Sequence, residues 1–200
     1  MHTNNLIDNL DNNNCMLAAK IFKRDVQITF ASIGRTPFSR GHTRSKIIEF
    51  SKRSVRRLRH TIRNSDELLK TFITLTYPAD ISCDGKKTKT YLNAFLQYLQ
   101  RKRLKHVWVL EFQLLGAPYY HIIATRYIDK DELSERWYKI VGSGDEKHLK
   151  SGTQINYIRS KNQLYGYLSN YIKNLEQKII PVGFENLGRF WGVSQIFWYS

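Results

Sequence analysis

Glu111, Tyr119 and His121 have side chains whose types and spacing can do chemistry. Glu111 interrupts an otherwise apolar segment, and a Gly-Ala-Pro turn leads into a second apolar segment that carries Tyr119 and His121 two positions apart. Residues two apart on a strand point to the same face of a sheet. A carboxylate and an imidazole on neighbouring strands can together bind a divalent ion. Two other interpretations are a histidine that is hydrogen-bonded in the core and a buried carboxylate with another partner.

Tyr167 and Tyr171 lie four residues apart in a segment whose apolar residues recur at spacings of three and four. This periodicity predicts a helix on which the two phenols share one face. Tyr165 points to another side of that helix. From the periodicity alone, the pair is interpreted as aromatic residues of the core.

Seven predicted elements position these side chains. Runs of β-branched and aromatic residues predict strands, and apolar residues at helical spacing predict helices. The expected order is strand 71–77, helix 90–103, strand 107–115, strand 119–127, helix 130–141, strand 155–158 and helix 161–176. A β-hairpin flanked by crossover helices is the ferredoxin-like pattern, so we predict an α+β fold with a mainly antiparallel sheet. The helices would cover one face and leave the other to hold a site.

The charge of the chain indicates nucleic acid as its partner. Thirty-two basic and 17 acidic residues leave a net charge of +15, and basic side chains make salt-dependent contacts with phosphates. Residues 44–64 predict a basic amphipathic helix, which either contacts a DNA backbone or presents a solvated face. A membrane-surface helix is disfavoured because the apolar stripe is narrow and lacks Trp. The candidate DNA-binding arginines of this helix are Arg53, Arg56, Arg57 and Arg59.

The remaining composition bounds the domain organisation. We expect residues 1–20, which are Asn-rich, to form a disordered tail ahead of one domain over residues 21–200, with a candidate strand at 21–33. Cys15 and Cys83 form no CxxC pair, which favours a reducing compartment such as the cytoplasm. We expect no membrane span and no phosphate-binding loop of a helicase motor.

Three stretches resemble, in order, the motifs of HUH-type rolling-circle replication initiators. This ORF2/gene II protein-like family includes replication proteins of phages and plasmids. The stretches are FITLTYP (residues 72–78), WVLEFQLLGAPYYHII (residues 108–123) and YGYLSNYIKNLEQKIIPVGFENLGRFWG (residues 165–192). An upstream EFSKRSVRRL (residues 49–58) also fits the group, so the motif-bearing region spans residues 44–195.

The resemblance implies a chemistry for the residues that match. In the family a tyrosine attacks a DNA phosphate beside a bound Mg²⁺ or Mn²⁺. Tyr167 and Tyr171 are then the candidate nucleophiles, and Glu111 and His121 the candidate metal ligands. The ion would polarise the phosphate and offset charge in the transition state.

This chain departs from the family pattern at three positions. Tyr119 stands where the family has a metal-binding histidine, and Asn170 and Asn174 stand where it has lysines. A phenol, with a pKa of about 10, is a poor ligand because it must first lose its proton. Three outcomes are open: a weakened metal site, a Tyr119 that takes part as a phenolate or through a water, or a chain that only binds DNA. The cations that can partly replace the missing charge are Lys173 and Lys178.

Other motif residues are expected to support or extend the site. Thr74, Thr76 and Tyr77 would lie beneath it, and residues 188–192 would close the core, with Arg189 as a candidate phosphate contact. We expect Phe112 and Tyr119 to be able to stack on unpaired bases. We expect His106 to be exposed at the start of its strand and not to replace a ligand.

The resemblance implies initiation of rolling-circle replication. Nicking would leave a 5′-phosphotyrosyl link and a free 3′-OH on single-stranded or hairpin origin DNA, with a host helicase and polymerase as partners. The alternatives are a DNA-binding relative that does not nick, an RNA-binding module of the RRM type and a transfer relaxase. The RRM alternative is disfavoured because no RNP1-like string occurs on a strand.

Overall fold

The computed structural model describes residues 7–8, 15–22, 25–32, 47, 49–64, 68–78, 84–113, 116–160, 162–167 and 179–194. The chain divides into two compact units. One comprises Met1–Ser45 with Arg59–Ser65, and the other comprises Lys46–Leu58 with Asp66–Ser200. The second unit contains the residues singled out for chemistry.

A five-stranded sheet with the strand order β7-β4-β6-β5-β8 forms the centre of the second unit, and all its pairs are antiparallel. The segment from β4 to β7 runs strand, helix, strand, strand, helix, strand, and β8 is added at the edge beside β5. This is the predicted α+β, ferredoxin-like arrangement, which is therefore confirmed. The bounds are β4 Thr71–Leu75, α2 Gly85–Arg101, β5 His106–Phe112, β6 Pro118–Ala124, α3 Lys130–Val141, β7 Thr153–Tyr157 and β8 Trp191–Val193.

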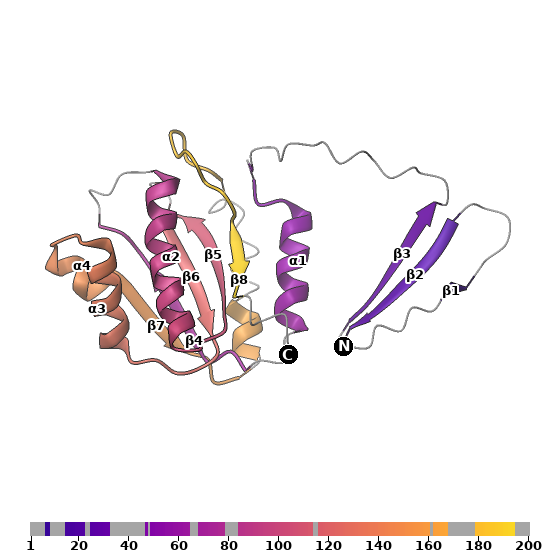
Figure 1. The fold of residues 1–200 in the computed structure, drawn as a ribbon, viewed down its shortest axis with the longest axis horizontal. Helices are drawn as coiled ribbons and strands as arrows, with labels where there is room; N and C mark the ends of the chain where they lie inside the picture. The colour runs from indigo at the N-terminus through magenta and orange to yellow at the C-terminus, as the bar shows by residue number, and fades with distance from the viewer. Residues whose placement is uncertain are drawn as a thin grey trace. The chain divides into compact units, whose positions relative to one another are not determined.

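Helices α2 and α3 cover one face of the sheet, and α2 crosses in front of β5 and β6 in Figure 1. Aromatic rings fill the space between these layers. Trp137 of α3 packs edge-on against Phe95 of α2, with ring centroids 5.7 Å apart, and against Tyr77, 5.2 Å away. Trp137, Phe95 and Tyr120 are fully buried. This face is the main hydrophobic core.

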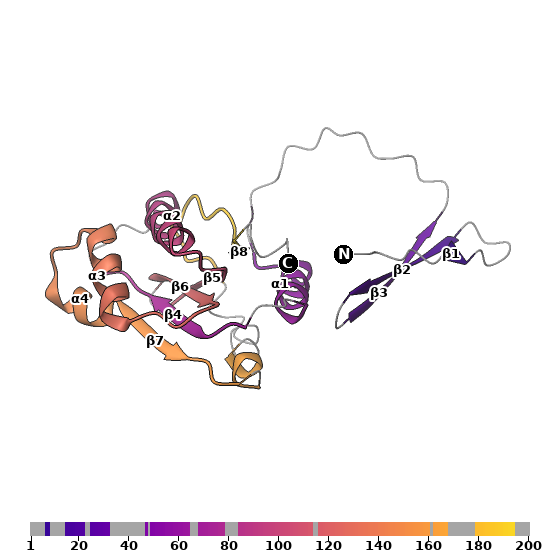
Figure 2. The ribbon, with the colours of Figure 1, turned by 60° about the horizontal axis from the view of Figure 1, so that its bottom comes forward.

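The opposite face carries the side chains that alternate with the core residues. Strand register pairs Thr74 with His121, and Glu111 with Tyr119. Residues 162–167 form a helical segment on this side, and Figure 2 shows it below the sheet, with α2 above. The indole Nε1 of Trp191 donates to Ser54 Oγ of α1, 2.8 Å away. The second face is thus partly covered, and the candidate site lies on it.

Helix α1 (Lys52–Arg63) is shorter than the helix predicted over residues 44–64. It begins at Lys52 because Ser51 caps it: the Ser54 N–H donates to Ser51 Oγ at 3.3 Å.

A separate three-stranded sheet has the order β1-β2-β3 and the bounds β1 Ile7–Asp8, β2 Cys15–Phe22 and β3 Asp25–Ser32. Strands β1 and β2 lie largely within residues 1–20, where the sequence predicted a disordered tail. The two long strands pair over their whole lengths as a hairpin with a two-residue connection, and β3 lies within the candidate strand at residues 21–33.

Helix α2 begins at Gly85, five residues before the predicted start at residue 90. Asp84 caps the helix by accepting the Lys86 N–H at 3.0 Å. A glycine is needed at this first position because an added Cβ would lie 2.4 Å from the carbonyl oxygen of Glu185. Helix α4 (Glu146–Ser151) was not predicted.

Candidate active site

Glu111 and His121 meet on the face of the sheet opposite α2. Glu111 Oε2 lies 3.3 Å from His121 Nε2, and both side chains are buried. The antiparallel register of β5 and β6 places them on adjacent strands, two positions apart and therefore on the same face, because Glu111 pairs with Tyr119 and Val109 with His121. The sequence expectation that these two residues share a site is consistent with this geometry.

Thr74 holds the other side of the His121 ring. Its Oγ1 lies 3.0 Å from His121 Nδ1, and the two residues are direct cross-strand partners on β4 and β6. A hydrogen bond at Nδ1 fixes the orientation of an imidazole and directs Nε2 toward whatever faces it, which here is Glu111. Of the three residues that the first motif placed beneath the site, Thr74 contacts His121, whereas Tyr77 packs on the helix-covered side against Trp137 and donates to the carbonyl oxygen of Thr88.

Tyr119 contacts both members of the pair. Its hydroxyl donates to Glu111 Oε2 at 3.0 Å, and its ring packs edge-on against His121 with centroids 4.9 Å apart. The phenol therefore stays in the site and occupies the same carboxylate oxygen that faces the imidazole. A buried carboxylate with two such neighbours has the polar partners that its burial requires.

The donor set fits a divalent ion only in part. The 3.3 Å between Oε2 and Nε2 is about the separation of two adjacent ligands of one ion with metal bonds of about 2.1 Å. Within the described part of the chain, no three His, Cys, Asp or Glu side chains gather into a metal-binding group. Water, phosphate oxygens or the Tyr119 hydroxyl would have to complete the coordination, as is usual for Mg²⁺.

Tyr167 is connected to the pair through an aromatic stack. Its ring lies nearly parallel to that of Phe72, with centroids 4.9 Å apart and an angle of 13°. Phe72 in turn contacts the His121 ring at 5.1 Å. Tyr167 is half-buried, and its hydroxyl accepts a hydrogen bond from Gln163 Nε2 at 3.4 Å. A partly accessible phenol therefore lies on the same face of the sheet as the pair and two aromatic contacts away from it.

The other candidate residues fall into three groups. The four candidate arginines of α1 and Arg189 are exposed. The carbonyl oxygen of Arg189 accepts a hydrogen bond from the Lys89 amine. Tyr165 is 38% exposed. The candidate DNA-binding arginines of α1 are Arg53, Arg56, Arg57 and Arg59. The residues that lie outside the described ranges are Asn170, Tyr171, Lys173, Asn174 and Lys178.

Two expectations from the sequence are wrong. His106 is buried, because the strand partner β8 is followed by Ser194, whose hydroxyl accepts the His106 N–H. Burial lowers the pKa of the His106 imidazole, and the hydrogen bond to the carbonyl of Leu104 partly opposes this shift. Phe112 is also buried, against Phe184 on the helix-covered side, so it cannot stack on an unpaired base.

Sequence reasoning missed Phe72 and Gln163. Phe72 lies two residues before Thr74 on the same strand, which was a usable signal for the same face. Gln163 lies four residues before Tyr167 in the helical segment, which was also a usable signal.

The model of the replication-associated protein family ORF2/gene II protein matches residues 70–176, just over half of the chain. The chain belongs to this family. Comparison with the curated proteins and with the solved structures found no match. The matched residues of this replication-associated protein include β4 to β7, the Glu111–His121 pair and both candidate tyrosines. No helix in the described ranges is long and apolar enough to cross a membrane.

Proposed function

We propose that this replication-associated protein cuts single-stranded origin DNA with a tyrosine and so initiates rolling-circle replication. The observation that carries the proposal is the contact series from Tyr167 through Phe72 to His121, beside Glu111. It combines an accessible phenol with a buried imidazole–carboxylate pair on one face of the sheet. A nucleophile near a group that can bind a cation is what phosphodiester cleavage requires.

In this reaction the phenol oxygen of Tyr167 attacks the phosphorus atom. A bond forms between the phenol oxygen and phosphorus, and the bond from phosphorus to the 3′ oxygen breaks. The 3′ oxygen leaves with the electron pair and takes up a proton, and the phenol proton passes to water. The products are a 5′-phosphotyrosyl link and a free 3′-OH that primes synthesis. The reverse reaction would close a displaced circle.

Glu111 and His121 are the residues that would hold Mg²⁺ or Mn²⁺, and a bound ion would polarise the scissile phosphate. Thr74 keeps the His121 ring oriented for this task. Tyr119 opposes it, because its hydroxyl occupies the Glu111 oxygen that faces the imidazole. We therefore propose a metal site weaker than one with two histidines.

The exposed arginines of α1 and Arg189 would contact the phosphates of the DNA. Lys173 and Lys178 are proposed to add charge near the candidate tyrosines. A host helicase would unwind the duplex, and a host polymerase would extend the 3′-OH.

The test is to incubate the protein with circular single-stranded DNA and Mn²⁺ and to look for a covalent protein–DNA band. We expect a band that Tyr167→Phe abolishes and that the control Tyr165→Phe, on the same helix, retains. Loss of the band in Tyr171→Phe alone would move the nucleophile to that residue. No band at any metal concentration, together with tight DNA binding, would overturn the enzyme proposal.

A second candidate function is DNA binding without cleavage. The hydrogen bond from Tyr119 to Glu111 favours it, because a carboxylate oxygen engaged by a phenol is less available to an ion. In that case the parent protein would bind origin DNA tightly but give no covalent band at any Mn²⁺ concentration.

A further inference from the structure

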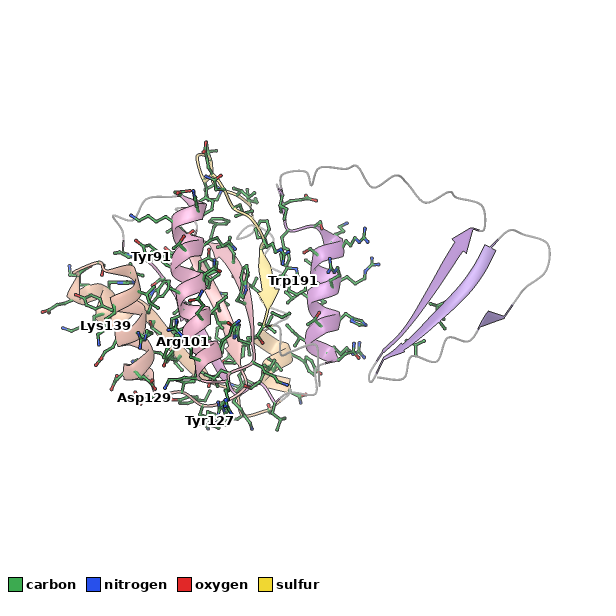
Figure 3. The ribbon with its side chains drawn as sticks, in the orientation of Figure 1. Tyr91, Arg101, Tyr127, Asp129, Lys139 and Trp191 are labelled. Atoms are coloured by element: carbon green, nitrogen blue, oxygen red, sulfur yellow. The ribbon has the colours of Figure 1, made fainter. Side chains whose placement is uncertain are left out.

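Two exposed tyrosines lie side by side at one end of the sheet, away from the Glu111–His121 pair. Tyr127 is 58% exposed and Tyr157 is 42% exposed, and their rings pack edge-on with centroids 5.2 Å apart. Tyr157 pairs with Thr71, whose neighbour Phe72 points to the opposite face with His121. The tyrosine pair therefore belongs to another surface of the domain. Figure 3 places Tyr127 at the lower edge of the molecule, below the end of α2 marked by Arg101.

The contacts of the pair hold it in place without burying it. The Tyr157 hydroxyl donates to the carbonyl oxygen of Ile128 at 3.1 Å, which fixes that ring. Leu68, at the approach to β4, is 61% exposed. Both rings and Leu68 are therefore held at the surface, where they can contact a ligand.

Basic side chains surround the tyrosine pair. Lys70 Nζ lies 5.8 Å from the centre of the Tyr127 ring, and the Arg126 guanidinium donates to the carbonyl of Lys102. Arg103 and Arg159 are exposed in the neighbouring loops.

Two acidic groups at this end, Asp129 and Glu132, have partners within the protein. The Asp129 carboxylate caps α3 by accepting the N–H groups of Asp131 and Glu132 at 2.9 Å each. Glu132 is paired with Lys102 and accepts the Tyr98 hydroxyl at 2.8 Å. These two carboxylates are therefore engaged by groups other than Lys70, Arg103 and Arg159.

Arg103 provides an independent sign of function. Its backbone is left-handed, with φ of 56°, and it ends α2 in a Schellman arrangement: the Arg103 N–H donates to Gln100 O and the Leu104 N–H to Leu99 O. Glycine is the residue preferred at this position, and any other side chain is strained by roughly 1 kcal/mol. A basic side chain is present in spite of that strain, and strained residues cluster at binding sites.

We propose that this end of the sheet is a second DNA-binding surface, which stacks an unpaired base on Tyr127 and contacts the adjoining phosphates through Lys70, Arg103 and Arg159. The ligand is single-stranded because only an unpaired base can expose its face to a tyrosine ring. The surface would hold DNA outside the residues that cut it. It does not depend on whether Tyr167 or Tyr171 is the nucleophile, or on whether cleavage occurs.

The test measures binding of fluorescent oligo-dT by anisotropy in a background that carries both Tyr167→Phe and Tyr171→Phe, so that cleavage plays no part. Tyr127→Ala should weaken binding by about 5-fold or more, the effect expected for one lost base stack. The matched control Tyr127→Phe keeps the ring and should bind like the parent. Equal binding by the alanine variant, or an equal loss with duplex DNA of the same length, would overturn the proposal.

A second variant tests the charges without risk to the fold. Arg103→Gly relieves the left-handed strain, so we expect a chain at least as stable as the parent that nevertheless binds oligo-dT more weakly. The slope of log affinity against log salt should also fall, by about 0.7 for one lost phosphate contact on a single strand. Unchanged affinity and an unchanged slope would remove Arg103 from the surface and contradict the proposal.

Discussion

The hydroxyl of Tyr119 donates a hydrogen bond of 3.0 Å to Glu111 Oε2, the same oxygen that lies 3.3 Å from His121 Nε2. The residue that departs from the family motif is therefore a direct partner of the residues that match it. A neutral phenol stabilises the buried carboxylate and competes for the oxygen that an ion would use. Whether the proposed site binds an ion depends on which of these two roles prevails.

We predict that Tyr119→His increases metal affinity and metal-dependent cleavage. The substitution places a second imidazole on the strand face that carries His121, and it removes the hydroxyl from Glu111 Oε2. Imidazole binds divalent ions near neutral pH, whereas a phenol does not. We expect the dissociation constant for Mn²⁺, measured by calorimetry, to fall by about 10-fold, which corresponds to about 1.4 kcal/mol.

Tyr119→Phe is the control for that experiment, because it removes the hydroxyl without adding a ligand. It should raise Mn²⁺ affinity less than Tyr119→His does. If neither variant binds Mn²⁺ more tightly than the parent, the Glu111–His121 pair is not a metal site.

We predict that Thr74→Val reduces cleavage through the orientation of His121. Valine has nearly the same shape as threonine but cannot form the hydrogen bond that joins Thr74 Oγ1 to His121 Nδ1 at 3.0 Å. Loss of a partner behind a metal-binding histidine lowers metal affinity by about 10- to 100-fold. The measurement is the dependence of the cleavage rate on Mn²⁺ concentration. Thr74→Ser should restore the parent behaviour, and equal rates for the valine and serine variants would show that the contact has no such role.

Much of the central sheet was predictable because its signals are local. Helix α3 has the predicted bounds, residues 130–141, since its apolar spacing and the cap at Asp129 agree. The hairpin of β5 and β6 was also predicted, and with it the shared face of Glu111 and His121. The first residue of α2 was not predicted, although the cap at Asp84 is local; the Gly85 N–H also donates to the carbonyl oxygen of Glu185, a hundred residues away.

The contacts that could not be predicted depend on pairing between distant segments. β8 has three residues and no alternation of its own, and it exists because Trp191 pairs with Val109. The same pairing buries His106, which the sequence placed at the surface. The hydrogen bond between Tyr119 and Glu111 likewise requires the register of β5 and β6, and a shift by one residue would place the two side chains on opposite faces.

We predict that Lys89 makes the stability of the protein rise with pH. Burial lowers the pKa of the Lys89 ammonium to about 7, with a further contribution from Arg189, whereas the unfolded chain keeps the ordinary lysine pKa of 10.5. Between these values the unfolded state binds more protons, so the free energy of unfolding rises as pH increases, by up to about 1.4 kcal/mol per pH unit. Below pH 7 Lys89 is protonated in both the folded and the unfolded state, so this group no longer makes the free energy of unfolding depend on pH.

The variant that checks this prediction is Lys89→Met, which keeps an unbranched chain over the Trp108 ring, now 4.0 Å from the Lys89 amine. Urea unfolding at pH 7, 8 and 9 should show the parent gaining stability relative to the variant. A constant difference between the two proteins over this range would mean that Lys89 keeps its proton throughout.

We predict that two helical glycines respond oppositely to alanine. At Gly85 a Cβ would lie 2.4 Å from Glu185 O and 2.8 Å from the carbonyl carbon of Asn186, so the backbone must move. Overpacking of this kind destabilises by about 1–3 kcal/mol.

At Gly166, in the helical segment beside Tyr167, nothing lies within 4 Å of the added Cβ. There alanine should stabilise the protein by roughly 0.5–1 kcal/mol, because glycine is the poorer helix former. The measurement is the free energy of unfolding in urea. The close approach of Glu185 to Gly85 is the reason for the expected difference between the two variants. If both variants changed the free energy of unfolding in the same direction, that close approach would not persist in solution.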